Sequence, residues 1–187
     1  MIELWRGCVN AWECDELGHL NVRFYLARLS EAVANLAEAA GLNPIQRPDA
    51  TATLVPRDIH VRFLAEAHPG APLFIEGGLL EVDACTATGI FIMRHSGTGK
   101  PAASFRVVLG HAAPETAIDF PWPARFLAQA ENLKVTLPDF AAPRGLELDD
   151  KTVIASPERA DALDLQTIGR GRLGPAEMDA FGWMRSE

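Results

Sequence analysis

The chain has 187 residues, 48% of them apolar, which is enough for one domain with a substantial core. Its formal net charge of −8 argues against a nucleic-acid-binding protein, because such proteins usually present a basic face. No apolar run approaches the roughly 20 residues of a membrane helix. The N-terminal residues do not resemble a signal peptide. We therefore expect a cytoplasmic protein with neither nucleic acid nor membrane as a partner.

The first two elements expected are a strand and a long helix. Aromatic, β-branched and small residues over 3–14 indicate the strand. Over 22–40 the apolar side chains recur at helical spacing, which predicts an amphipathic helix with one apolar face. Gly41 and Pro44 indicate where this helix ends.

Four further strands are expected over 52–64, 72–83, 86–94 and 102–111. The connections between them are short, which predicts antiparallel pairing. One long helix before such strands indicates an α+β fold with the helix packed on the sheet. The pair Gly77-Gly78 predicts a bulge or strong curvature, as when a sheet wraps around a helix. A short helix is expected over 121–133.

The end of the chain repeats its beginning at a constant offset of 164 positions. The matching pairs are Arg6 and Arg170, Gly7 and Gly171, Glu13 and Glu177, Asp15 and Asp179, and Gly18 and Gly182. Such a repeat predicts a tandem duplication of one helix-plus-sheet unit. The expected organisation is a domain over 1–133, a linker over 134–167, and the first strand and motif of an incomplete second unit over 168–187. An accidental resemblance of the tail is the alternative.

The segment from Glu13 to Asn21 carries the residues with the most obvious chemistry. It places the carboxylate of Asp15, a glycine and a histidine directly before a helix, whose first backbone N–H groups lack partners. Such groups stabilise a developing oxyanion, while a neighbouring carboxylate can activate water or attack a carbonyl carbon. The pattern predicts cleavage of an acyl compound, provided that Asp15 is buried beside the helix start and close to a cleft.

The same segment, followed by Phe24-Tyr25-Leu26, resembles the D-x-D-x-x-G-H-v-N…y signature of hotdog-fold acyl-CoA thioesterases of the 4-hydroxybenzoyl-CoA thioesterase type. The element order fits this fold over about residues 1–130, and the repeat resembles the double-hotdog subgroup. The resemblance implies that Asp15 acts on the thioester as base or nucleophile. It also implies that the backbone N–H of about Val22 binds the thioester oxygen.

Two positions depart from that signature. Glu13 replaces the commoner first aspartate, and Val22 stands where many members have asparagine or tyrosine, so no side chain assists there. In the C-terminal copy Trp183 replaces His19 and Arg185 replaces Asn21, so the second site is expected to be altered or inactive.

The other residues of the predicted site have competing structural roles. His19 either orients the substrate or Asp15, or satisfies a polar position under the helix. Gly18 and Asn21 are grouped with Val22 as the expected oxyanion and substrate-binding residues. Gly18 also closes the turn, and Asn21 fits an N-cap better than a catalytic group. Asp15 itself can serve as an Asx-turn or cap. Tyr25 is expected in the core.

No cofactor is expected apart from coenzyme A as part of the substrate, and no metal. Arg57, Arg94 and Lys100 are candidates for the coenzyme A phosphates, which favour fixed cations, although each can also be an ordinary solvated residue. The other histidines show no metal-ligand spacing; they are His60, His68, His95 and His111. Residues 96–100 superficially resemble a phosphate-binding loop. Because they lack its first glycine and precede Pro101, a hairpin turn is expected.

Two hotdog units usually pair with the active site at their shared boundary. The expected partner is therefore a second unit, either in a homodimer or as a pseudo-dimer within one chain. Two other functions fit the same residues: a hotdog enoyl-CoA hydratase or dehydratase, and a non-catalytic acyl-CoA-binding module. No residue in the sequence specifies the acyl group.

Overall fold

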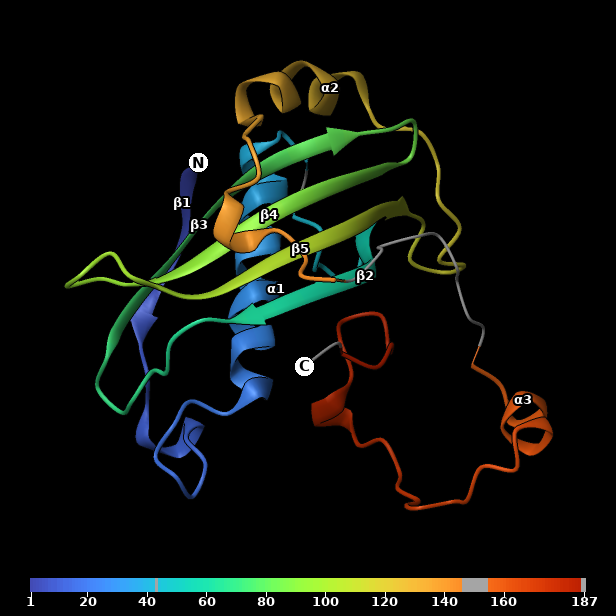
Figure 1. The fold of residues 1–187 in the computed structure, drawn as a ribbon. Coiled ribbons are helices and arrows are strands. Elements are labelled where there is room, and N and C mark those ends of the chain that lie inside the picture. The colour runs from blue at the N-terminus through green and yellow to red at the C-terminus, as the bar shows by residue number, and fades with distance from the viewer. Residues whose placement is uncertain (43, 146–154, 186–187) are drawn as a thin grey trace.

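The computed structural model describes residues 1–42, 44–145 and 155–185. Its centre is one antiparallel sheet of five strands in the order β1-β3-β4-β5-β2. The strands are β1 (Ile2–Cys8), β2 (Thr53–Phe63), β3 (Pro72–Val82), β4 (Thr86–His95) and β5 (Pro101–Ala112). Figure 1 shows this sheet lying across the long helix α1 (Val22–Ala39). This arrangement confirms the predicted α+β fold, in which one long helix packs on an antiparallel sheet.

Helix α1 begins and ends at the residues that the sequence indicates. The Asn21 side chain accepts a hydrogen bond from the backbone N–H of Arg23, which caps the first turn. At the other end Gly41 adopts φ +79°, a left-handed conformation that stops the helix. Within the described residues, no helix is long and apolar enough to span a membrane.

The remaining helical segments are short. They are the α-helices α2 (Ala124–Ala130) and α3 (Pro157–Ala162), and the 3-10 turns η1 (Ala11–Glu13), η2 (Glu131–Leu133), η3 (Asp139–Ala141) and η4 (Pro175–Glu177). Together α2 and η2 confirm the short helix expected before residue 133.

The predicted first strand is wrong over its second half. Strand β1 ends at Cys8, and the chain then turns into η1. The turn forms because Asn10 and Glu13 bond reciprocally: the Glu13 N–H donates to the Asn10 carbonyl, and the Asn10 N–H donates to Glu13 Oε2 at 2.9 Å. This local capping outweighs the β-forming composition of the segment.

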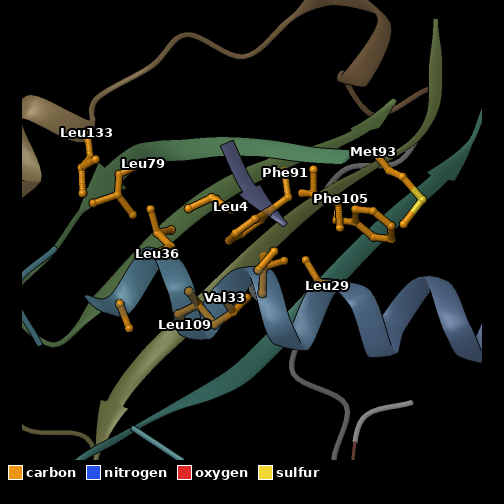
Figure 2. Packing of buried hydrophobic residues seen from close by; sticks show 14 of the residues in the cluster. Leu4, Leu29, Val33, Leu36, Leu79, Phe91, Met93, Phe105, Leu109 and Leu133 are labelled. Carbon is orange, nitrogen blue, oxygen red and sulfur yellow. The ribbon is translucent and has the colours of Figure 1, made fainter. Parts of the chain in front are cut away.

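The main core lies between α1 and the sheet (Figure 2). Leu29, Val33 and Leu36 on the inner face of α1 meet Phe91 and Phe105 of the sheet, and every one of these side chains is 7% exposed or less. The apolar face predicted for this helix is therefore the one it buries.

The opposite face of the sheet is covered by the chain that follows η2. Val135, Phe140 and Ala141 pack over Ile90 and Ile92, which are fully buried. The segment expected to be a linker from residue 134 therefore begins as part of the domain's packing.

The Gly77-Gly78 pair allows this covering segment to approach closely. A Cβ on Gly78 would lie 2.6 Å from the carbonyl oxygen of Leu133. The bulge expected at the pair falls just beyond it, since the register between β3 and β4 shifts between Leu79 and Glu81. The two glycines are thus required mainly by close approach of backbone.

Residues 155–185 contribute no buried side chain. In Figure 1 they form the orange-to-red stretch that contains α3 and ends in a loop near the C-terminus. Several of their apolar side chains are solvent-exposed, including Leu165 at 62% and Ile168 at 100%, whereas Phe181 and Trp183 are partly covered.

Candidate active site

Residues 15–19 form a tight turn, called here the Asp15 turn, that is closed by its first residue. Asp15 Oδ1 accepts hydrogen bonds from the N–H groups of Leu17 and His19, both at 3.0 Å. The Asp15 N–H donates to the His19 carbonyl, and the Gly18 N–H donates to the Asp15 carbonyl. Gly18 has φ +76°, which side-chain-bearing residues rarely adopt. The Asx-turn expected as the alternative role of Asp15 is therefore present.

The Asp15 side chain is exposed, which corrects the expectation of a buried acid. Its Oδ1 is occupied by the turn, whereas Oδ2 receives no hydrogen bond from any described residue. That oxygen remains free to take a proton from water or to attack a carbon. The turn thus orients the carboxylate and leaves half of it available for chemistry.

The start of α1 leaves one backbone donor free. The Arg23 N–H donates to Asn21 Oδ1 at 3.0 Å, and the Phe24 N–H donates to the Asn21 carbonyl at 2.9 Å. The N–H of Val22 has no hydrogen-bond partner in the part of the chain that the structure describes, and Val22 is 55% exposed. This is the donor that the sequence predicts for an oxyanion, at the positive end of the helix dipole.

Gly18 and Asn21 have structural roles in the same region. The Gly18 N–H is used within the Asp15 turn, and the Asn21 N–H donates to the Glu13 carbonyl at 2.9 Å. Neither residue offers a free backbone donor, so the predicted oxyanion group of Gly18, Asn21 and Val22 reduces to Val22. Asn21 is the N-cap, as its residue type suggests.

Glu13 fixes the loop to α1. Its side chain is 3% exposed and forms an ion pair and hydrogen bond with Arg28, in the second turn of the helix. Arg28 also pairs with Glu31 at 2.7 Å and lies 5.3 Å from the ring of Trp5. The departure from aspartate at this position therefore has a structural purpose: a buried carboxylate that holds η1 against the helix.

A second loop, between β2 and β3, lies against the Asp15 turn. The Leu20 N–H donates to the carbonyl of Ala67 at 2.8 Å. On either side of Ala67, Glu66 Oε2 lies 3.4 Å from His19 Nε2, and His68 Nδ1 lies 3.1 Å from the Gly18 carbonyl oxygen. Sequence reasoning missed Glu66 and His68, because only the pairing of two distant loops brings them to His19.

A pocket of about 440 Å³ adjoins this contact. It is lined by the β2–β3 loop and the β4–β5 hairpin, specifically Ala65, Glu66, His68, Pro72, His95, Gly97, Thr98 and Lys100. Residues 96–100 form the hairpin turn that was expected in place of a phosphate loop. A cleft therefore lies next to the Asp15 turn, connected to it through His68.

Of the three cations predicted for the coenzyme A phosphates, only Lys100 lines this pocket. Arg57 is held by Asp119 at 2.5 Å and by the carbonyl of Ala117 at 2.6 Å. Arg94 is held by Glu76 at 2.7 Å and by the carbonyl of Gly99 at 3.0 Å. Both arginines are neutralised by carboxylates within the domain, because cross-strand and loop neighbours supply counter-charges that the sequence order does not reveal.

Tyr25 lies beneath the site and belongs to the core, as expected. It is 4% exposed and meets the Phe63 ring edge-on, with 5.1 Å between ring centroids. Burial raises the pKa of the Tyr25 hydroxyl, so this group stays neutral across the physiological range.

The C-terminal copy of the motif forms the same kind of turn over residues 179–183, called here the Asp179 turn. Asp179 Oδ1 accepts from the N–H groups of Phe181 and Trp183, both at 2.9 Å. The Asp179 N–H donates to the Trp183 carbonyl, and Gly182 has φ +80°. Unlike the Asp15 turn, this copy forms no hydrogen bond with the described residues of the β2–β3 loop and precedes no described helix.

Comparison with known proteins identifies the family. The sequence profile described as "Thioesterase-like superfamily" matches residues 9–137, more than half of the chain. The chain belongs to the thioesterase-like superfamily. This membership confirms the predicted class of enzyme, a thioester hydrolase. No curated protein matches the chain.

Several solved structures share the fold. A putative thioesterase from Pseudomonas putida aligns over 79% of this chain and 97% of its own, with TM-score 0.66 and 20% identity. A Staphylococcus aureus protein solved in complex with coenzyme A covers 78% and 96%, with TM-score 0.66 and 16% identity. A 1,4-dihydroxy-2-naphthoyl-CoA thioesterase from Synechocystis covers 69% and 95%, with TM-score 0.60 and 16% identity. At such identities the likeness concerns the fold, and it confirms the hotdog architecture.

Proposed function

We propose that this thioesterase-like protein hydrolyses an acyl-CoA, with the Val22 N–H holding the thioester oxygen and Asp15 as base or nucleophile. One observation carries the proposal: the unpaired N–H of Val22 stands at the start of α1, seven positions after a carboxylate with one free oxygen. A helix N-terminus stabilises the negative charge that develops on a thioester oxygen during attack.

Two routes use these groups. As a base, Asp15 takes a proton from water, the hydroxide attacks the thioester carbon, and the C–S bond breaks to release coenzyme A. The thiolate then takes up a proton. As a nucleophile, Asp15 attacks the carbon itself, giving a mixed anhydride that water hydrolyses. Both routes end with a free acid and a thiol.

Completion of the site requires a covering surface, because Asp15 is exposed in the single chain. The residues around it support such a surface: Trp12, Leu17 and Val22 are large apolar side chains that are 77%, 78% and 55% exposed. Neighbouring exposed apolar side chains of this kind are typical of an interface. We propose that a second hotdog unit covers them, supplied by another copy of the chain or by a unit that residues 168–187 begin.

The second-unit proposal is supported by the Asp179 turn, whose hydrogen bonds reproduce those of the Asp15 turn. The repeat predicts a domain over 1–133 and a connecting segment over 134–167; because Val135, Phe140 and Ala141 pack on the sheet, we propose that the domain continues through Ala141. Analytical ultracentrifugation tests the pairing: a homodimer that dissociates in Leu17→Glu supports it, and a wild-type monomer with full activity contradicts it.

Coenzyme A is proposed as part of the substrate and not as a separate cofactor. The fold is shared with a protein solved with coenzyme A and with a naphthoyl-CoA thioesterase. Lys100 offers a side-chain cation without a partner among the described residues, and it lines the pocket beside the Asp15 turn. Three free thiols accord with the cytoplasmic location expected from the sequence.

The decisive variant is Val22→Pro. Proline at the first helical position removes the N–H in question together with a valine side chain that is 55% exposed, and it suits this position because Asn21 is already extended at φ −64° and ψ 142°. Thiol release from a panel of acyl-CoA esters should fall in kcat by about 100- to 1,000-fold. The unfolding transition should stay within about 0.5 kcal/mol of wild type.

The matched control is Val22→Ala, which keeps the N–H and should retain activity. Equal activity of wild type and Val22→Pro would contradict the oxyanion role. If wild-type protein binds acyl-CoA without releasing thiol, the binding-module function replaces hydrolysis. If the wild-type protein hydrates enoyl-CoA esters instead, the hydratase function replaces hydrolysis.

A further inference from the structure

Three side chains of metal-ligand type converge where the β2–β3 loop meets the Asp15 turn. The coordinating atoms of His19, Glu66 and His68 all lie within 4.8 Å of one another. Across the described residues 1–42, 44–145 and 155–185, this is the single group of three or more His, Cys, Asp or Glu side chains gathered so closely.

The backbone holds the three residues in place. Ala67 is fully buried, and its carbonyl accepts the Leu20 N–H at 2.8 Å, so the two loops are joined between the ligands. Glu66 and His68 flank Ala67 on the solvent side. His19 precedes Leu20, and its backbone is bonded to Asp15 through both N–H and carbonyl. The cluster is therefore built on fixed backbone rather than on free loop ends.

The hydrogen bonds of the histidines leave nitrogen atoms available to a cation. A carbonyl oxygen only accepts, so His68 Nδ1, 3.1 Å from the Gly18 carbonyl, carries the proton and leaves the lone pair on Nε2. A histidine ring fixed through its other nitrogen by a carbonyl is the usual outer support of a metal ligand. His19 Nε2 faces Glu66 Oε2 at 3.4 Å, where a cation would serve both atoms.

We propose that His19, Glu66 and His68 bind one divalent transition-metal ion, with Zn²⁺ the best fit among biological metals. Two imidazoles and one carboxylate are a ligand set that zinc uses when a fourth position is left to water or substrate. Glu66 and His68 also line the 440 Å³ pocket, so the open position has access to it. The site goes beyond the proposed hydrolysis, because neither Asp15 nor Val22 is a ligand.

Metal binding is measured directly, without reference to activity. The full chain is stripped with a chelator and titrated with Co²⁺, followed by visible absorption, and with Zn²⁺, followed by calorimetry. We expect one ion per chain, and at least a tenfold weaker Kd in His68→Ala and in Glu66→Gln. The matched control is His95→Ala, a histidine on the wall of the same pocket but outside the cluster, which should leave the Kd within twofold of wild type.

Two results would overturn the site: no stoichiometric uptake by the wild-type chain, or an equal loss of affinity in His95→Ala. Thermal unfolding of each metal-free variant separates a lost ligand from a lost fold, since Glu66 and His68 are exposed.

The Asp15→Asn variant separates this proposal from the proposed function. The amide oxygen of asparagine still accepts the Leu17 and His19 N–H groups, so the turn and the metal Kd should stay unchanged while thiol release is lost. Metal uptake without any thiol-releasing activity would support the site and reject hydrolysis. Hydrolysis without metal uptake would support the proposed function and reject the metal site.

Discussion

The Asp15 turn and the Asp179 turn are the same local structure in two different surroundings. In both, an aspartate Oδ1 accepts two backbone N–H groups, and a glycine with φ near +80° completes the turn. In both, a 3-10 turn precedes the aspartate and its glutamate accepts a backbone N–H: Asn10 to Glu13 at 2.9 Å, Gly174 to Glu177 at 2.5 Å.

The two turns differ in the structure around them: the helix that follows, the anchoring side chains and the neighbouring loop. The Asp15 turn leads into α1, is anchored by the buried carboxylate of Glu13 bonded to Arg28, and touches a loop that borders a pocket. The Asp179 turn has no buried neighbour and no described helix after it. A dozen residues are therefore enough to specify the turn, whereas a catalytic site also requires the helix start and the opposing loop.

The sharpest way to test this comparison is to remove each carboxylate in turn. Asp15→Asn should lower kcat for thioester hydrolysis by about 1,000-fold, because an amide neither takes a proton nor attacks a carbon. Asp179→Asn should leave kcat within about twofold, because no free N–H at a described helix start accompanies that carboxylate. Thiol release at saturating acyl-CoA measures both.

The asparagine keeps the accepting oxygen at either position, so both turns should persist, and unchanged far-ultraviolet circular dichroism checks this. A large loss of activity in Asp179→Asn would mean that the C-terminal turn takes part in catalysis, and the contrast between the copies would disappear.

Substitution of Glu13 and of its counterpart Glu177 tests whether the bond between Glu13 and Arg28 anchors the Asp15 turn. Glu13→Ala removes a 3% exposed carboxylate that accepts hydrogen bonds from Arg28 and from the Asn10 N–H, while Arg28 keeps its ion pair with Glu31, so the free energy of unfolding should fall by about 2 kcal/mol. Glu177→Ala removes one hydrogen bond at an exposed site and should cost less than about 0.5 kcal/mol. Urea denaturation of both variants gives the difference, and equal costs would contradict the anchoring role.

The same contrast explains what the sequence could and could not predict. Periodicity over 22–40 and short connections between strands predicted α1 and the antiparallel sheet, because local pattern decides both. The Asx-turn of Asp15 and the cap of Asn21 were also predictable, since each depends on residues within four positions.

Contacts between distant segments escaped prediction. Glu66 and His68 reach His19 only because Leu20 bonds to Ala67, and Asp119 and Glu76 neutralise Arg57 and Arg94 only once the sheet is formed. The exposure of Asp15 was not predictable for a related reason. A helix start can be identified in the sequence, but the residues that cover it depend on tertiary or quaternary structure.

Substitution of the two turn glycines, Gly18 and Gly182, should have a smaller effect on the free energy of unfolding. Gly18→Ala and Gly182→Ala meet no atom within 4 Å of the new Cβ, so the only direct cost is the left-handed backbone, about 1 kcal/mol. In Gly18→Ala this cost should appear in global unfolding, because Leu20 ties the turn to buried Ala67. In Gly182→Ala it should be absorbed locally, and the global transition should not move. A shift of equal size in both would show that the Asp179 turn unfolds together with the domain.

The smallest effect is expected from removing residues 155–187 altogether. The described part of this segment buries no side chain, whereas Val135, Phe140 and Ala141, which cover the sheet, lie before it. A chain of residues 1–154 should therefore unfold within about 0.5 kcal/mol of the full chain, a shift of about 1–2 °C in Tm. Differential scanning calorimetry of both chains at equal concentration measures this. A drop of several kcal/mol would mean that the C-terminal copy stabilises the first unit, and the two turns would then have to be treated as parts of one cooperative structure.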